Sequence, residues 1–170
     1  MISKFSATSY DFVEYLPLAK NLIAGQFVNP SGTASMPVMN PRHGQAMSQV
    51  TFSTSADVDR SVASAKAALP AWRAVPMRER AAVLYRSRQI ILRDIDELSW
   101  LVSHENGKIF SEAKAEVEKA IECLEYGCSL PNIAAGEKIE VSRGVTCEVF
   151  YEPLGIVAGV VPFNFPLMVP

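Results

Sequence analysis

The stretch GIVAGVVPFNFPLMVP, Gly155 to Pro170, decides the fold class of this chain. Its first part, Ile156–Val161, is a continuous apolar run, which is typical of a parallel strand covered on both faces. The part that follows, Pro162–Pro166, holds one asparagine between two phenylalanines and two prolines. Prolines remove backbone donors and favour extended or turn geometry, so packing alone does not explain this pentapeptide. In open α/β sheets, ligands gather beyond the carboxyl ends of the strands, and the pentapeptide occupies that place.

The segment before this run has the period of a strand with one buried face. Such a strand places successive side chains on opposite faces of the sheet. We therefore expect one strand over residues 139–151. On one face it carries Ile139, Val141, Arg143, Val145, Cys147, Val149 and Tyr151, and on the other Glu140, Ser142, Gly144, Thr146, Glu148 and Phe150.

Helical periodicity dominates the middle of the chain. Residues 54–57, Thr-Ser-Ala-Asp, match a loose capping box, and the helix that they start is expected to stop at Pro70. A long amphipathic helix is expected from Pro76 to Asn106, and another over residues 111–127. The core stripe of the last helix consists of Ala113, Val117, Ile121, Leu124 and Cys128.

Extended segments and turns precede the helices. Residues 22–28 carry a glycine between two apolar pairs, and residues 40–44 form a turn that leads into Val50, Thr51 and Phe52. Together they predict a short hairpin-like edge.

Composition and charge place the chain among soluble globular proteins. Its 170 residues are 49% hydrophobic and 20% charged, and the net charge of −2 gives no footprint for nucleic acid or for an anionic membrane surface. The one apolar run long enough to consider as a membrane span, residues 153–170, contains four prolines, which argue against a spanning helix. The start, MISKFSATSYDFVEYL, lacks an apolar signal core and reads as mature sequence.

The three cysteines have no metal-ligand or redox spacing, and the chain has only two histidines. We expect no metal site. Buried or half-buried thiols in a reducing compartment are the simplest interpretation of Cys123, Cys128 and Cys147, which favours a cytoplasmic protein.

Residues 153–166, PLGIVAG followed by PFNFP, resemble the aldehyde dehydrogenase superfamily. The segments LIAGQFV, MNPRHGQAMSQV, ADVDRSVASAKAALPAWRAVPMRERAAVL and ENGK resemble the same family in the same order, from about residue 20. AEVEKAIECLEYGCSLP, together with Phe163 where many relatives have tryptophan, is most similar to the methylmalonate-semialdehyde dehydrogenases. That group is NAD-dependent and makes an acyl-CoA. The resemblance implies an α/β fold, in which helices pack on the start of an open Rossmann-like sheet and an oligomerisation strand leaves the domain.

The resemblance also assigns roles to residues. Asn164 stands where the family's asparagine donates its amide to the aldehyde oxygen in an oxyanion hole, beside a backbone N–H of the catalytic cysteine. A neutral, preorganised donor of this kind stabilises the developing charge by roughly 3–4 kcal/mol. Val161, Pro162 and Phe163 stand where the family contacts the nicotinamide-ribose side of NAD. An ordinary turn asparagine is the alternative for Asn164.

Lys119 stands where the semialdehyde subfamily usually has an arginine thought to hold the substrate carboxylate. Lysine keeps the positive charge but lacks the planar guanidinium that binds a carboxylate through two hydrogen bonds. The substitution therefore weakens the assignment of a malonate-type substrate. By helical spacing it lies about 200° round from Val117, so a solvated surface lysine is an equal alternative.

In the family, the nucleophilic cysteine, the general-base glutamate and the residues that grip the adenosine half of NAD all follow the asparagine, and none is present up to Pro170. The chain is about one third of a family member's length and is expected to be a fragment.

We expect the NAD-binding domain over residues 1–137 and 153–170, and the oligomerisation arm over residues 138–152. By this resemblance the whole enzyme would oxidise a (methyl)malonate-semialdehyde-like aldehyde, through a thiohemiacetal and a thioester, to an acyl-CoA or an acid, as a homodimer or tetramer. The chain alone would be inactive, and a noncatalytic module with the cofactor-domain shell is the rival interpretation.

Overall fold

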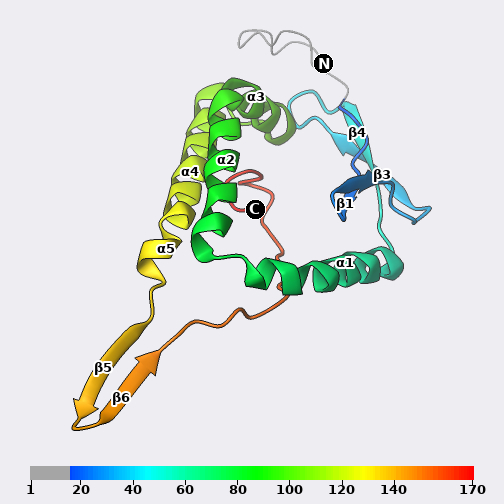
Figure 1. The fold of residues 1–170 in the computed structure, drawn as a ribbon. Coiled ribbons are helices and arrows are strands. Elements are labelled where there is room, and N and C mark those ends of the chain that lie inside the picture. Colours follow the sequence, from blue (N-terminus) through cyan, green and yellow to red (C-terminus); the bar gives the residue numbers. More distant parts are fainter. Residues whose placement is uncertain (1–15) are drawn as a thin grey trace.

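The computed structural model describes residues 16–170, so the expectation for the first fifteen residues lies outside the described part. Within it the chain forms five helices and three two-stranded antiparallel sheets (Figure 1). The strands are β1 (Asn21–Ile23), β2 (Gln26–Val28), β3 (Ser35–Met39), β4 (Ala46–Thr51), β5 (Glu137–Ser142) and β6 (Val145–Val149), and the helices are α1 (Ser55–Ala74), α2 (Met77–Arg93), α3 (Ile95–Asn106), α4 (Phe110–Cys128) and α5 (Leu130–Ile133).

The expected hairpin-like edge is confirmed as two hairpins, β1–β2 and β3–β4. The first turns at Ala24 and Gly25, which both have positive φ, as a two-residue hairpin turn requires. The second turns over residues 40–44, where the side-chain oxygen of Asn40 accepts hydrogen bonds from the N–H groups of Arg42 and His43. The amide of Asn40 donates to the carbonyl of His104 at 3.3 Å, which ties this hairpin to the end of α3.

The capping box that starts α1 is confirmed. The carboxylate of Asp57 is buried, and it accepts hydrogen bonds from the N–H groups of Thr54 and Ser31, both at 2.9 Å, and from the Ser31 hydroxyl at 2.7 Å. These bonds, with an ion pair to Arg60, hold the pKa of Asp57 well below its usual range.

The expected stop at Pro70 is wrong, because α1 continues to Ala74. Proline removes one donor from the helix, which leaves the carbonyl of Lys66 without its partner. Both Lys66 and Pro70 are exposed, so water can hydrate that carbonyl, and only one further turn of helix follows.

The long helix expected from Pro76 to Asn106 is in fact two helices. Asp94, with φ −105° and ψ 19°, ends α2 and begins α3. Its carboxylate binds the guanidinium of Arg93 at 2.6–2.7 Å, and this bond lowers the pKa of Asp94. The apolar period passes through the break unchanged, so the sequence pattern gives no sign of it.

The helix α4 is confirmed almost to the residue, and it packs against both α2 and α3. Figure 1 shows α2 and α4 side by side, with α1 running away from them toward the small sheets. The expected stripe is buried except for Leu124, which is half-buried. The buried residues of the core are Met47, Ala81, Trp100, Val102, Ala113, Val117, Ala120, Ile121 and Cys128.

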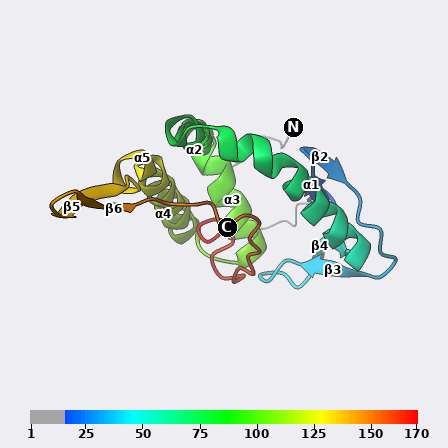
Figure 2. The same cartoon turned by 60° about the horizontal axis from the view of Figure 1, so that its bottom comes forward.

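The single strand expected over residues 139–151 is wrong: the segment is a hairpin, β5–β6, which turns at Arg143 and Gly144. Gly144 has φ +74°, a conformation that glycine adopts without strain. Every residue of both strands is exposed, and the hairpin projects from the helices in both views (Figures 1 and 2).

The parallel strand expected over residues 156–161 is also not formed. A strand needs a neighbour to receive its backbone hydrogen bonds, and no described residue pairs with this run. The chain before this run contacts α1, where Glu152 forms an ion pair with Arg73, and the residues after it, 167–170, lie beside α2 and α4. The expected mixture of helices and strands is therefore confirmed, whereas the Rossmann-like sheet is not built within residues 16–170.

The cysteine expectation is correct for one residue of three. Cys128 is buried, whereas Cys123 and Cys147 are exposed, and all three are free thiols. Among the helices of the described part, none has the length and apolar character to cross a membrane.

Candidate functional site

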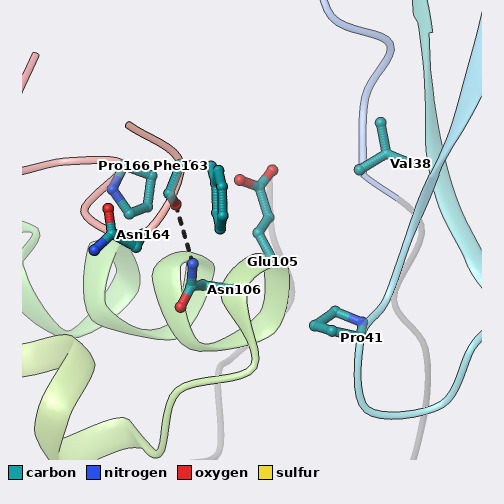
Figure 3. A pocket seen from close by; sticks show the side chains of 7 residues that line it. All are labelled: Val38, Pro41, Glu105, Asn106, Phe163, Asn164 and Pro166. Atoms are coloured by element: carbon teal, nitrogen blue, oxygen red, sulfur yellow. Dashed lines mark hydrogen bonds between the residues drawn. The ribbon is translucent and has the colours of Figure 1, made fainter. Parts of the chain in front are cut away.

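A cavity of about 510 Å³ lies between the β3–β4 hairpin, the end of α3 and the asparagine pentapeptide. Figure 3 shows Val38 and Pro41 on one side of it and the pentapeptide on the other. The residues that line it are Val38, Pro41, Glu105, Asn106, Phe163, Asn164 and Pro166. Three segments far apart in the sequence thus meet around Asn164.

The end of α3 is shaped by Gly107. This residue has φ +83° and caps the helix, and its N–H donates to the carbonyl of Ser103 at 2.9 Å. A Cβ at this position would lie 3.0 Å from the Pro41 ring, so glycine suits both the backbone and the space. The hydroxyl of Ser103 donates to the carbonyl of Lys108 at 2.7 Å and fixes the start of the next segment.

Asn106 and Lys108, on either side of this glycine, both reach the pentapeptide. The amide of Asn106 donates to the carbonyl of Phe163 at 3.1 Å (Figure 3). The ammonium of Lys108 donates to the carbonyl of Asn164 at 2.6 Å and lies 4.2 Å from the centre of the Phe165 ring. Two consecutive carbonyls of the pentapeptide are therefore held by one loop.

Glu116 of α4 holds the residues that follow. Its carboxylate accepts the N–H groups of Leu167 at 2.9 Å and Met168 at 3.3 Å, and the ammonium of Lys108 at 2.5 Å. Burial disfavours the charge of Glu116, but these hydrogen bonds outweigh it and lower the pKa of the carboxyl. We call residues 162–168 the asparagine turn.

The side chain of Asn164 has a different environment from its backbone. The residue is exposed and lines the cavity, and no described residue forms a hydrogen bond with its side-chain amide. The expected NAD contacts precede it on an exposed segment, with Val161 47% and Phe163 88% exposed and Pro162 exposed between them. The backbone of Asn164 is therefore held in place, while its side-chain amide has no hydrogen-bond partner among the described residues.

Lys119 is not part of this arrangement. It is exposed on α4, forms an ion pair with Glu122, and does not line the cavity. The hydrogen bond from Lys119 to Glu122 raises the pKa of the ammonium. A role for Lys119 in substrate binding stays a prediction.

Sequence reasoning missed Asn106, Lys108 and Glu116. The first two lie in the ENGK segment, which carried only a family resemblance. Glu116 had a usable signal: it lies three residues after Ala113 and four before Ala120, on the face that α4 buries. A carboxylate within a buried stripe needs partners, and its partners lie in other segments.

Known proteins are similar to this chain over most of its length. The family model for the aldehyde dehydrogenase family matches residues 27–170. Malonate-semialdehyde dehydrogenase 1 of Geobacillus kaustophilus (strain HTA426) is 41% identical over 152 residues, which are 89% of this chain and 31% of the relative.

Among solved structures, a putative methylmalonate-semialdehyde dehydrogenase from Sinorhizobium meliloti 1021 complexed with NAD matches with a TM-score of 0.86 at 31% identity, over 92% of this chain and 32% of that one. Methylmalonate-semialdehyde dehydrogenase from Oceanimonas doudoroffii matches with a TM-score of 0.86 at 35% identity, over 91% of this chain and 32% of that one. The chain spans about a third of the length of these relatives. The resemblance read from its motifs is confirmed, and the chain belongs to the aldehyde dehydrogenase family.

Proposed function

We propose that this chain is the N-terminal part of an NAD-dependent aldehyde dehydrogenase that acts on a malonate- or methylmalonate-semialdehyde-like substrate. The proposal includes a cofactor domain over residues 1–137 and 153–170 and an oligomerisation arm over residues 138–152. It is supported by family membership and by relatives whose names describe this substrate class.

The observation that carries the proposal is the state of Asn164. Its backbone carbonyl is fixed by Lys108 at 2.6 Å, while no described residue uses its side-chain amide, which borders the cavity. Attack of a thiolate on an aldehyde places negative charge on the carbonyl oxygen. A donor held in place before the reaction stabilises that charge without reorganising, which is worth roughly 3–4 kcal/mol.

The residues assigned to NAD are accessible to a ligand. Val161, Pro162 and Phe163 are exposed, and the backbone of the first two forms no hydrogen bond within the described residues. Their groups are free to meet a ligand, and NAD when bound would supply the hydride acceptor for aldehyde oxidation. The solved relative from Sinorhizobium meliloti is complexed with NAD, which supports the choice of cofactor.

The acyl acceptor in this proposal is coenzyme A or water, as in the semialdehyde subfamily that the sequence resembles. Carboxylate recognition by Lys119 would require the lysine to leave its ion pair with Glu122. Its exposed position makes that exchange inexpensive, because exposed ion pairs are screened by water and contribute little to stability.

A hybrid enzyme tests the proposal. The aligned first third of the Geobacillus kaustophilus relative is replaced by this chain, and NADH formation from malonate semialdehyde is followed with and without coenzyme A. Asn164→Ala should lower kcat on the order of a hundredfold or more and leave the Kd for NAD nearly unchanged, because the amide acts on charge that develops during the reaction.

Asn132→Ala is the matched control, since Asn132 is an exposed asparagine on α5 away from the cavity. It should behave as the unmodified hybrid does. Full activity of the Asn164→Ala hybrid would overturn the proposed role, and an equal loss of NAD affinity would show that Asn164 serves the cofactor instead.

A further inference from the structure

The pair formed by Lys108 and Glu116 is unusual for its burial and its number of bonds. The Glu116 side chain is 1% exposed and that of Lys108 is 18% exposed. A buried ion pair adds little to stability compared with apolar residues of the same size, because both ions lose their hydration. Stability alone is therefore a weak reason for burying this pair.

Both members of the pair also form hydrogen bonds with the backbone of the asparagine turn. Lys108 donates to the carbonyl of Asn164 at 2.6 Å, across 56 positions of sequence. Glu116 accepts the N–H groups of Leu167 and Met168 at 2.9 and 3.3 Å. One ion thus holds the peptide that bears the asparagine, and the other holds the peptides that follow it.

The chemistry of the two groups suits this task. The ammonium of Lys108 has three N–H donors, and the structure shows it against the Glu116 carboxylate, the Asn164 carbonyl and the ring of Phe165. The carboxylate of Glu116 uses one oxygen for Lys108 and the other for the two backbone N–H groups. Charge-assisted bonds of this kind are roughly twice as strong as neutral ones, so they hold the turn more firmly than neutral partners would.

We propose that the Lys108–Glu116 pair is the positioning element of the oxyanion donor: it sets the direction in which the Asn164 amide points. The inference rests on the proposed function of Asn164. Neither Lys108 nor Glu116 touches the reacting aldehyde in this account, and both act through the asparagine. A fixed amide is needed because a displacement of about 1 Å in a reacting geometry can cost on the order of a hundredfold in rate.

Lys108→Met in the hybrid enzyme is the first test, because methionine keeps the apolar stem and removes the donors. It should lower kcat between about tenfold and a hundredfold with little change in the Kd for NAD. Lys108→Arg, which restores a cation at the same place, should recover part of the loss. The control is Lys114→Met, which removes an exposed ion pair with Asp96 and should leave kcat unchanged.

A double-mutant cycle separates positioning from folding. If Lys108 acts through Asn164, then Asn164→Ala should cost far less in the Lys108→Met background than in the unmodified hybrid, because the misdirected amide has already lost its effect. Full additivity of the two losses would overturn the inference, and so would an unchanged kcat in Lys108→Met. If Asn164→Ala alone has no effect, the proposed function fails first, and the two failures are therefore distinct.

Amide hydrogen exchange of the 170-residue chain keeps the inference testable if the hybrid does not assemble. Lys108→Met should raise exchange in the segment 163–169 by at least about tenfold and leave the amides of α2 unchanged. Exchange that rises equally in both segments, or in neither, would overturn the positioning role.

Discussion

Replacing the carboxylate of Glu116 by an amide should loosen the asparagine turn. Glu116→Gln keeps the shape of the side chain but replaces one oxygen by an NH₂ group. That group must face either the ammonium of Lys108 or the N–H groups of Leu167 and Met168, and each of these is a donor. One side of the arrangement therefore becomes a donor–donor contact at hydrogen-bond distance.

The magnitude follows from the bonds that are lost. A hydrogen bond to a charged group contributes about 1.5–3 kcal/mol, and removing one partner of a buried pair costs about 3–5 kcal/mol. Glutamine retains one acceptor, and Lys108 keeps some contact with water, so we expect a loss of about 2–4 kcal/mol in the free energy of local opening. Since 1.4 kcal/mol is a factor of ten, exchange of the Leu167 and Met168 amides should rise roughly thirtyfold to a thousandfold.

Hydrogen exchange at single-residue resolution measures this effect, with Glu118→Gln as the control. Glu118 lies on the exposed side of the same helix, and its replacement should change the exchange of both amides by less than about twofold. If Glu116→Gln changes exchange no more than this control does, the carboxylate does not hold the turn, and the geometric argument fails.

Three further predictions concern other parts of the molecule. Asp57 has a lowered pKa, so its contribution to stability is complete above the unfolded pKa of about 3.9 and is lost as pH falls below it; the stability difference between the parent and Asp57→Asn should shrink in acid urea titrations. A difference that is constant with pH would contradict this. Replacing Val145 and Val149, both exposed on β6, by lysine should reduce the mass of the hybrid oligomer in light scattering, and an unchanged mass would remove the arm assignment. The chain alone should show no aldehyde-dependent NADH formation, and turnover abolished by changing Cys123 would refute that expectation.

Local chemistry explains which elements the sequence predicted correctly. The capping box at Thr54 and the stripe of α4 are set by residues three and four positions apart, which are neighbours in any helix. The turns at Gly25 and Gly44 depend on positive φ at the glycine itself. Such features need no distant partner, so the sequence is sufficient to place them.

Elements that depend on other segments were predicted poorly. The residues 139–151 alternate like one strand, yet they fold back at Gly144 because their partner is their own second half. The apolar run 156–161 has the composition of a central strand but meets no partner within the described residues. Alternation and apolarity report which faces a strand could bury, and they carry no information about which strand pairs with it.

The sequence by itself determined the family and the helical core, because these follow from ordered motifs and from periods of a few residues. Only the tertiary structure decided how Asn164 is held. Lys108 and Glu116 are eight positions apart, and each lies more than fifty positions from the residues of the turn to which it is hydrogen-bonded. The sequence shows where charged residues stand but not which groups they bind in the folded chain. A buried carboxylate is stable only where the fold brings hydrogen-bond donors to each of its oxygens.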